Sequence, residues 1–438
     1  MKIKTFGSIC SGIEAASFVF EPLGLRPLWF SEIADFPCSF LKYKYPSIIN
    51  LGDMNDIPKL IANNEIEIPD FLCGGTPCQA FSLAGWKNGL NDDRGQLTLK
   101  YIDILNEIDK KRIEKGLNKA IFLWENVEGV LKDRTNAFGC FISGLAGLDN
   151  VISLKKWPSA GVLYGPDRNI AWRIIDSKYL GLPQQRKRLY VIGGGTDFNP
   201  ENILLEQGEK ISDPFKTAQL KEKELSLFDL ETDNSVSEKI SEVRRIINDS
   251  EIEVFRSYSD CLYAAYGTKW NGNAAAYNGS LFISQNGKIR RLTPLECERL
   301  MGFPDNYTCI PKNKDTLRYQ AIGNSWAVPV IQWIGKRIIN YNSLERIILS
   351  QSIRQDYSDY KLFCINDFIM NGNSSYLNGS PMISDYKIKN ILDIIDTNAP
   401  EKFYISPKGC AGILRRKEER NLTINKRLEF ILRSCSQI

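Results

Sequence analysis

The sequence predicts an α/β protein built on a doubly wound sheet, the type of fold in which helices cover both faces of the sheet. Two observations lead to this prediction. Short apolar runs alternate with helix-like segments through the first 200 residues. Most of these runs are also followed by polar or small residues, which is typical of a sheet that binds ligands at the carboxyl ends of its strands.

Five apolar runs have the length and composition of buried strands, and they lie at residues 4–9, 27–31, 70–73, 120–124 and 188–192. A helix is expected at residues 97–114. The first four runs are followed by CSGIEAA, Glu32, GGTPCQ and ENVEGV. Because ligands bind outside the carboxyl ends of strands in such sheets, we expect these segments to converge on one crevice.

Composition divides the chain into four parts. Residues 1–195 carry the alternating pattern, and residues 196–289 form a variable region that is first acidic and then rich in Gly and Asn. Residues 290–345 return to regular structure, and TPLE near their start has the spacing of a helix capping box. Residues 346–438 are expected to form a separate C-terminal module that ends in a basic, helical segment.

Composition also excludes several kinds of site. The chain has no histidine, which rules out Cys–His dyads, Ser–His–Asp triads and His-ligated zinc. Its 11 cysteines, an odd number without disulfide-framework spacing, indicate a reducing compartment. Glu14 interrupts the N-terminal apolar run, so we expect a soluble, cytoplasmic protein without membrane contact. A net charge of +4 is compatible with nucleic-acid binding but does not require it.

Cys78 stands directly after a proline in GGTPCQAFS, residues 74–82. A cysteine nucleophile needs its thiolate, which is scarce at neutral pH unless a neighbour lowers the pKa of the thiol. Without histidine, that neighbour must be an arginine, a helix N-terminus or the substrate itself. Taken alone, Cys78 is better explained as a buried structural thiol, and the motifs elsewhere in the chain change that interpretation.

Taken together, these segments resemble the DNA cytosine-5 methyltransferases over residues 3–340. The motifs that carry the resemblance follow the family's order: CSGIE, Glu32, GDMND, GGTPCQAFS, DDRGQL, ENV at residues 125–127, QQRKR at residues 184–188 and GNS at residues 323–325. The resemblance implies a Rossmann-like, S-adenosylmethionine-dependent methyltransferase sheet in residues 1–195, completed by residues 290–345. It also implies a smaller target-recognition domain in the variable region, followed by a C-terminal extension.

The resemblance assigns the catalytic roles. Cys78 would add to C6 of the target cytosine, which makes C5 nucleophilic enough to accept a methyl group. Glu125 would act as the acid at N3 of the base. Arg186 and Arg188 would hold that glutamate and the base oxygen, and their charge would favour the Cys78 thiolate. Nothing in the sequence identifies the base that removes the C5 proton after methyl transfer.

S-adenosylmethionine is the methyl donor that the resemblance implies, with S-adenosylhomocysteine as product and no metal ion. The adenosine would lie over Gly12 and Ile13, Glu32 would bind the ribose hydroxyls, and Asp53 would accept a hydrogen bond from the adenine amino group. Other positions that match donor contacts are Cys10, Ile33, Met54, Pro77, Leu97 and Asn324.

Departures from the family pattern predict a weaker donor site. Cys10 stands where the family usually has Phe, and Glu14 and Ala15 stand where it usually has two glycines. Ile33 likewise occupies a position where an aromatic residue is common. Stacking of the adenine on this chain is therefore expected to be poorer than in the family.

Double-stranded DNA is the partner that the resemblance implies, with the target cytosine flipped out of the helix. The residues expected to contact DNA are Gln79, Gln184, Lys269, Trp270 and Asn271. The C-terminal module is expected either to pack against the rest of the protein or to make an accessory DNA contact. Its clustered basic residues are Lys408, Arg415, Arg416, Lys417 and Arg420.

Several alternatives remain open at this stage. The same motifs fit a tRNA cytosine-5 methyltransferase, or a catalytically silent homologue that only binds DNA. A nicotinamide oxidoreductase is disfavoured because the first glycine loop lacks G-x-G-x-x-G. We expect a monomer that acts in the cytoplasm of a bacterial cell, encoded by the bacterium or by a bacteriophage. Neither the recognition sequence nor a cognate restriction endonuclease as partner can be deduced from the residues.

Overall fold

The structure is a computed structural model that describes residues 3–76, 96–215, 244–269, 277–351, 354–372 and 375–437. The chain divides into two compact units. Unit 1 comprises Met1–Asp176, Lys187–Lys210 and Val330–Asp385, and unit 2 comprises Ser177–Arg186, Ile211–Pro329 and Tyr386–Ile438. The segment 346–438, which the sequence analysis treats as one module, is divided between these units.

Unit 1 is built on a sheet of ten strands in the order β14-β15-β6-β7-β8-β5-β4-β1-β2-β3. The strands are β1 (Thr5–Ile9), β2 (Arg26–Ser31), β3 (Ile49–Asn50), β4 (Phe71–Gly74), β5 (Ile121–Val127), β6 (Ala160–Tyr164), β7 (Asn169–Asp176), β8 (Lys187–Gly194), β14 (Arg354–Asp356) and β15 (Lys361–Ile365). The strands from β3 to β5 pair in parallel, and the remaining pairs are antiparallel. The strand order therefore reverses between β1 and β4, the type of point where such sheets bind ligands.

The strands and the long helix that the sequence predicts are present. The five predicted strands correspond to β1, β2, β4, β5 and β8, and the predicted helix corresponds to α5 (Gln96–Glu114). Each begins and ends within three residues of its predicted bounds. The short apolar runs, several of them rich in aromatic residues and leucine, therefore form strands in this fold, as their composition indicates.

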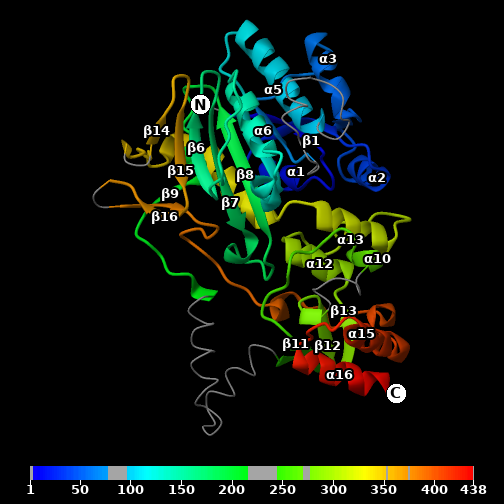
Figure 1. The fold of residues 1–438 in the computed structure, drawn as a ribbon. Helices are drawn as coiled ribbons and strands as arrows, with labels where there is room; N and C mark the ends of the chain where they lie inside the picture. Colours follow the sequence, from blue (N-terminus) through cyan, green and yellow to red (C-terminus); the bar gives the residue numbers. More distant parts are fainter. Residues whose placement is uncertain are drawn as a thin grey trace. The chain divides into compact units, whose positions relative to one another are not determined.

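Helices lie on both faces of this sheet (Figure 1). The helical elements outside the main sheet are α1 (Ala15–Phe20), α2 (Asp35–Lys44), η1 (Met54–Asp56), α3 (Ile57–Ala62), η2 (Glu128–Lys132), α6 (Ala137–Ala146), α7 (Glu201–Leu204) and η4 (Tyr341–Ser343). A separate three-stranded sheet consists of β9 (Glu206–Gly208), β16 (Asp367–Met370) and β17 (Tyr376–Gly379). One face packs against α3, α5 and α6 in a single buried cluster. On the other face, Phe6 and Phe71 both contact Phe20 of α1. The doubly wound α/β prediction is thereby confirmed.

The first part of the predicted C-terminal module extends the main sheet. Lys361–Ile365 pairs antiparallel with Ala160–Tyr164, and β14 pairs with β15 in turn. This pairing joins segments about 200 residues apart, which a local sequence pattern does not reveal. Residues 354–365 therefore belong to unit 1.

Unit 2 contains an antiparallel sheet of β10 (Arg244–Ile247), β11 (Ser250–Val254), β12 (Phe282–Gln285) and β13 (Lys288–Arg291). Its helical elements are η3 (Ser177–Tyr179), α10 (Tyr266–Lys269), α12 (Pro294–Met301), α13 (Asp315–Asn324), η6 (Ile391–Ile394), η7 (Glu401–Phe403), α15 (Pro407–Glu419) and α16 (Lys426–Ser436). Helix α14 (Val328–Ile339) begins in this unit and continues in unit 1. The predicted capping box is confirmed, because Thr293 and Glu296 each cap the other's backbone at the start of α12. Within the described ranges, no helix is long and apolar enough to cross a membrane.

Candidate active site

The turn between β1 and α1 has an unusual backbone. Cys10, Gly12 and Glu14 have φ angles of 49°, 56° and 54°, in the left-handed region that favours glycine. A Cβ atom added to Gly12 would meet no other atom within 4 Å, so the space next to this residue is open. The Gly12 amide donates to Glu32 Oε2 at 2.8 Å, which ties the end of β1 to the end of β2. A ligand can therefore approach the backbone closely at this edge of the sheet.

Glu14 holds this turn from inside the protein. The residue is 1% exposed, and its Oε1 accepts from the Ser17 amide at 3.1 Å as the N-cap of α1. Its Oε2 accepts from the Ser8 hydroxyl of β1 at 3.0 Å. Burial raises the pKa of Glu14 to about 7, although hydrogen bonds from Ser8 and Ser17 oppose the shift. In the sequence, Glu14 stands out as a break in the N-terminal apolar run and as a departure from the family pattern, whereas the structure makes it a helix cap.

Glu32 and Asn50 join the ends of β2 and β3. Glu32 Oε1 accepts from the amides of Ile33 and Ala34, each at 2.9 Å. Asn50 Oδ1 accepts from the Glu32 amide at 2.9 Å, and Asn50 Nδ2 donates to the Glu32 carbonyl at 3.0 Å. These contacts orient the carboxylate, and Oε2, which among the described residues accepts only from the Gly12 amide, keeps a further lone pair for a ligand hydroxyl. Asn50 was missed at the sequence level because a single asparagine after a short strand carries no distinctive pattern.

Cys10, Asp53 and Met54 lie close together at the same edge. Asp53 is exposed and accepts from the Asn55 amide at 2.9 Å as the cap of η1. Met54 is buried, with its sulfur 3.9 Å from Cys10 Sγ. Burial and the nearby charges of Glu32 and Asp53 raise the pKa of the Cys10 thiol to about 12. The structure thus brings together four of the residues predicted to bind the cofactor: Cys10, Glu32, Asp53 and Met54.

Three further residues from that prediction differ in exposure. Ile33 is 72% exposed directly after Glu32, whereas Ile13 is 1% exposed. Leu97, near the start of α5, packs against the buried cluster of unit 1. An exposed Ile33 provides an apolar surface against which a flat apolar ring can pack.

The segment before the predicted nucleophile is anchored by buried polar groups. Trp124 Nε1 donates to the Thr76 hydroxyl at 3.0 Å, and Asn126 Nδ2 donates to the Thr76 carbonyl at 3.1 Å. The Thr76 and Thr98 hydroxyl oxygens also lie 3.1 Å apart. The ENV motif is therefore tied to the backbone just before the PCQ motif. The predicted site residues of that motif lie outside the described residues: Pro77, Cys78 and Gln79.

Glu125 and Arg188 form an ion pair between β5 and β8. Arg188 Nε lies 3.1 Å from Glu125 Oε1, and the side chains of Arg188 and Glu125 are only 15% and 12% exposed. Arg188 Nη1 also donates to the Lys187 carbonyl at 2.9 Å. Because water screens this pair only weakly, the arginine orients the carboxylate firmly at the carboxyl end of β5.

Arg186 and Gln184 of the same QQRKR motif are buried within unit 2. The Arg186 guanidinium donates to the carbonyls of Leu262 and Gly323, each at 3.1 Å. Gln184 is 0% exposed, donates to the Leu300 carbonyl at 3.1 Å and accepts from the Leu262 amide at 2.8 Å. Both side chains connect distant segments of unit 2, a structural role that the sequence does not indicate. Their contacts with the base and with DNA stay predictions.

The remaining predicted ligand contacts are also in unit 2. Lys269 ends α10, and Asn324 is exposed at the end of α13. Trp270 and Asn271 lie outside the described residues.

The predicted basic segment of the C-terminal module forms α15 and its end. Arg415 pairs with Glu419 on the same helix, and Lys417 pairs with Glu429 of α16. Lys408 and Arg420 are exposed. Part of the positive charge in this segment is therefore offset by acidic neighbours.

The residues at the carboxyl edge of unit 1 fit an adenosine-containing cofactor. The open backbone at Gly12 allows close approach, the Glu32 carboxylate can accept from ribose hydroxyls, and Ile33 can pack against a base. Among the residues that the structure describes, no group of three or more Cys, Asp or Glu side chains is placed to hold a metal ion.

This fold, with polar residues gathered beside the reversal of strand order, is that of a doubly wound α/β protein with a candidate ligand site at the carboxyl ends of its strands. A family model described as C-5 cytosine-specific DNA methylase matches residues 4–340. The chain belongs to that family, which confirms the resemblance drawn from the motifs. The match ends before the segment that begins at residue 346.

Among similar proteins, a DNA N-6-adenine-methyltransferase of Escherichia phage P1 is 34% identical over 463 aligned residues, which cover 77% of this chain and 61% of that protein. The chain thus spans about three fifths of the length of that relative. Type II methyltransferase M.DsaV of Dactylococcopsis salina is 30% identical, with 77% of this chain and 87% of that protein covered. Type II methyltransferase M.HhaI of Haemophilus parahaemolyticus is 29% identical, with 63% of this chain and 78% of that protein covered.

Proposed function

We propose that this protein transfers a methyl group from S-adenosylmethionine to C5 of a cytosine in duplex DNA. The observation that carries the proposal is the Glu125–Arg188 ion pair, because it holds a carboxyl group at the sheet edge where the cofactor residues gather. Asn126, next to that carboxyl group, bonds the backbone that leads into the PCQ motif. Family membership supports the same chemistry.

In the proposed mechanism, the Cys78 thiolate adds to C6 of the flipped cytosine, and the electron pair of the C5–C6 double bond becomes available at C5. Glu125 stabilises the developing negative charge by hydrogen bonding at N3, and Arg188 keeps Glu125 in place. Once C5 carries the new methyl group, a base removes the C5 proton and the C6–sulfur bond breaks. Cys78 is then released as a thiolate, and the product base is 5-methylcytosine.

S-adenosylmethionine supplies the electrophilic methyl group when it is bound. Glu32 would hold the ribose, Asp53 the adenine amino group, and the Gly12 backbone would permit close approach. Other proposed contacts come from Cys10, Ile13, Ile33, Met54, Pro77, Leu97 and Asn324. We propose no metal ion in this reaction.

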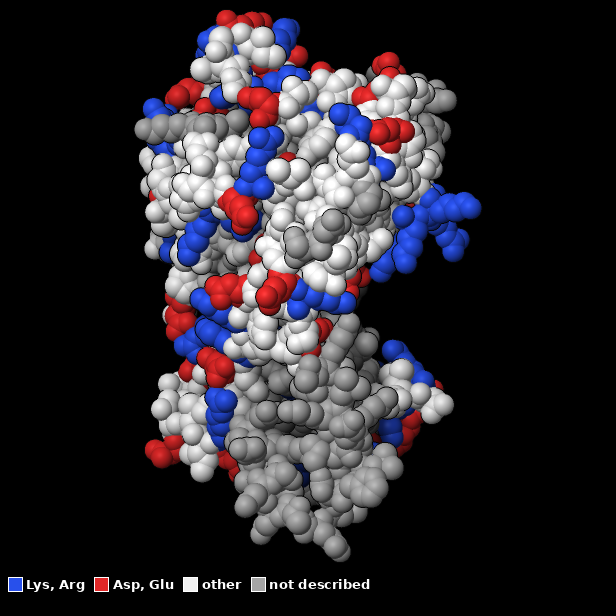
Figure 2. All heavy atoms as spheres, turned by 90° about the vertical axis from the view of Figure 1, so that its left-hand side faces the viewer, with Lys and Arg blue, Asp and Glu red and all other residues white. Residues whose placement is uncertain are grey.

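DNA recognition is proposed for the variable region, residues 196–289. Extrusion of a base costs a few kcal/mol, which contacts to the partner base and the flanking bases must offset. Figure 2 shows Lys and Arg side chains interspersed with Asp and Glu on the face that it presents, so charge alone does not mark a DNA surface there. Gln79, Gln184, Arg186, Lys269, Trp270 and Asn271 remain the proposed contacts with DNA or the base.

We further propose a monomer that acts on DNA in the cytoplasm of a bacterium, encoded by the bacterium or by a phage. A cognate restriction endonuclease would fit this setting, because relatives described as Type II methyltransferases are among the similar proteins. To test that link, DNA that this protein has methylated and unmethylated DNA are each treated with a crude endonuclease fraction from the source cell. A cognate nuclease should cleave the unmethylated DNA and spare the methylated DNA.

A covalent trap tests the proposed nucleophile. Duplex DNA that carries 5-fluorocytosine at the target should form a stable adduct with the protein in the presence of S-adenosylmethionine, because fluorine cannot leave as a proton does. Mass spectrometry of the digested adduct should place the crosslink on Cys78. A crosslink on another residue, or no adduct with a substrate that is otherwise methylated, contradicts the mechanism.

A further inference from the structure

In the antiparallel sheet of unit 2, which we call the small sheet, strands β12 and β13 are covered on both faces by the chain that follows residue 385. Successive residues of a strand point to opposite faces of a sheet. In the pairing of β12 with β13, Ser284 stands opposite Ile289 and Ile283 stands opposite Arg290. Ile289 and Arg290 therefore mark the two faces.

Helices α15 and α16 cover the first face. Phe282 and Ile289 of the sheet share a cluster of 12 buried residues with these helices and the turn between them. Eight members of that cluster follow residue 385: Cys410, Ile413, Leu414, Ile424, Leu428, Ile431, Leu432 and Cys435. Because each large apolar side chain contributes about 1.5–3 kcal/mol on full burial, the C-terminal segment supplies most of the apolar stabilisation of this face.

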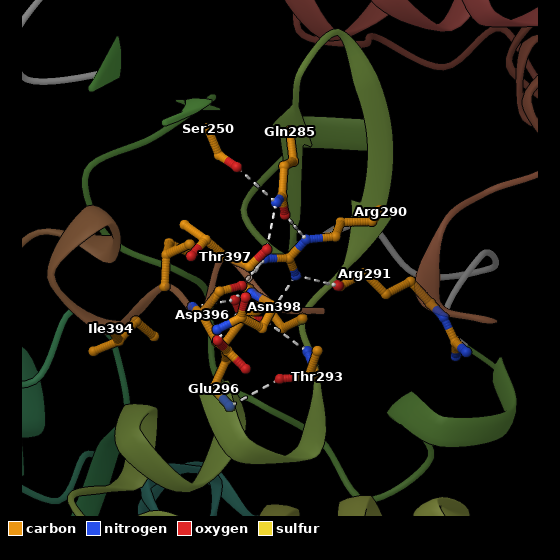
Figure 3. A network of polar contacts seen from close by, with 12 residues as sticks. Ser250, Gln285, Arg290, Arg291, Thr293, Glu296, Ile394, Asp396, Thr397 and Asn398 are labelled. Carbon is orange, nitrogen blue, oxygen red and sulfur yellow. Dashed lines mark hydrogen bonds and ion pairs between the residues drawn. The ribbon is translucent and has the colours of Figure 1, made fainter. Parts of the chain in front are cut away.

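A second C-terminal segment, residues 390–398, crosses the other face, and we call it the strap. Arg290 Nη2 donates to the Asp396 carbonyl at 2.9 Å, and Gln285 Nε2 donates to the Thr397 carbonyl at 2.7 Å (Figure 3). The Asp396 amide donates in return to Glu296 Oε1 at 2.9 Å. Side chains of β12, β13 and α12 thus hold the strap by its backbone.

Arg290 is the centre of this network. Its side chain and that of Glu296 are both 0% exposed, and two hydrogen bonds of 2.7 and 2.9 Å join them. Its other donors reach Gln285 Oε1 at 2.9 Å and the Arg291 carbonyl at 3.0 Å, in addition to the strap. Burial of an ion pair is costly unless its polar groups are hydrogen-bonded, and the planar fork of arginine achieves this with a fixed geometry.

Helix α12 holds the strap at a second point. Arg299 donates to the carbonyls of Ile394 and Ile395 at 3.1 and 3.2 Å, and it pairs with Asp305. Element η6, within the strap, also contacts β11. The strap therefore links the small sheet to α12, which in turn contacts α13, the helix that carries the GNS motif.

We propose that the strap fixes the small sheet in the position needed to read DNA, and that Arg290 is the positioning residue. The inference rests on the proposed function, because it takes the variable region to recognise the DNA sequence. The protein's own chain covers both faces of the sheet at β12 and β13, whereas Ile246 of β10 is 78% exposed, so the residues that read DNA must lie away from the covered strands.

The experiment compares sequence discrimination in the full-length protein and in variants. Arg290→Lys keeps a positive charge next to Glu296 but loses the fork, and Arg299→Ala removes the second point of attachment. Arg354→Ala serves as the control, since it removes an exposed ion pair with Asp356 in unit 1. Each protein methylates a duplex library with randomised flanks, and bisulfite sequencing gives the ratio of methylation at the preferred sequence to that at single mismatches.

We expect both strap variants to lower this ratio at least about fivefold, since one mismatched base pair is worth about 1–3 kcal/mol in a well-placed interface. Their affinity for S-adenosylhomocysteine should match that of the wild type, and Arg354→Ala should keep the wild-type ratio. An unchanged ratio in folded strap variants, even with a lower melting temperature, would leave only a structural role and overturn the inference. If Arg290→Lys does not fold, the methylation ratio of Arg299→Ala alone tests the inference. Absence of any DNA cytosine methylation by the wild type overturns the proposed function as well.

Discussion

Arg188 lies diagonally across the strand pair from Glu125, with its Nε 3.1 Å from Glu125 Oε1. The register of β5 and β8 places Arg188 opposite Val127, two residues beyond Glu125. Side chains two residues apart lie on the same face of a sheet, so the pairing of the strands itself brings the two together. Strand β8, which runs antiparallel to β5, thus places the Arg188 guanidinium at the carboxyl end of β5.

Glu125→Gln should slow methyl transfer by about a hundredfold or more, the range for loss of a positioned acid. The variant keeps the shape of the side chain but cannot form the ion pair. Tritiated methyl incorporation into DNA measures the rate, and calorimetry with S-adenosylhomocysteine should give wild-type affinity. Glu128→Gln, which removes an exposed ion pair with Lys132, is the matched control. Wild-type turnover in Glu125→Gln would show that this carboxyl group has no catalytic role.

Gly12→Ala should weaken binding of S-adenosylhomocysteine at least about fivefold, since overpacking costs about 1–3 kcal/mol. The added methyl group would point into the open space next to the turn. Gly24→Ala is the control, because Gly24 also has a positive φ, 89°, and open space around its Cβ position. Both variants should lose about 1–2 kcal/mol of stability to backbone strain. Equal affinities in the two variants would mean that the cofactor does not lie over Gly12.

Glu14→Gln should flatten the dependence of stability on pH. Burial raises the pKa of Glu14 to about 7 in the folded protein, above its ordinary value, so the folded state binds this proton more tightly than the unfolded chain does. The resulting stabilisation is complete at low pH and is lost as the pH rises towards about 7. Between about pH 5 and about pH 8, the free energy of unfolding of the wild type should fall by about 2–3 kcal/mol relative to that of Glu14→Gln.

Urea unfolding of both proteins across this range measures the difference. The groups that face Glu14 are the hydroxyls of Ser8, Ser11 and Ser17 and the thiol of Cys73, whose pKa burial raises well above its ordinary value. These groups therefore stay neutral over the range. Glu67→Gln, at an exposed pair with Arg26, should keep the wild-type slope. If the free energy of unfolding depended on pH in the same way for wild type and Glu14→Gln, the result would contradict a buried carboxyl group that titrates in this range.

Removal of residues 386–438 should unfold the small sheet while the cofactor site stays intact. The deletion takes away both the strap and eight of the 12 residues in the buried cluster on the first face of the sheet. Hydrogen exchange should show loss of protection in β12 and β13, and calorimetry should show unchanged affinity for S-adenosylhomocysteine. Retained protection in these strands would mean that they fold without the C-terminal segment.

The sequence predicts the parts of this protein that depend on local pattern. Strands such as β1 and β5 are short apolar runs, and the capping box at the start of α12 is a threonine followed three residues later by a glutamate. Glu125 and Arg188 are singled out by their place in the ENV and QQRKR motifs, which resemble those of the family. These features need no knowledge of distant pairing.

Features that depend on long-range pairing are not visible in the sequence. Gln184 contacts the Leu300 carbonyl, 116 residues away, and Arg173 is buried among carbonyls that include that of Ser380, 207 residues away. The division of the C-terminal segment between the two units has the same origin, since β15 pairs with β6 while α16 contacts β13. The burial of Arg290 likewise depends on the strap, whose Asp396 carbonyl lies 106 residues later in the chain.

Nucleoside analysis of methylated DNA tests the central claim most directly. Purified protein, S-adenosylmethionine and either duplex DNA or tRNA are incubated, and the digested products are separated by mass spectrometry, with Cys78→Ala in parallel. The account predicts 5-methylcytosine in DNA with the wild type and none with Cys78→Ala. N6-methyladenine as the product, methylation of tRNA alone, or 5-methylcytosine formed at the wild-type rate by Cys78→Ala would contradict it.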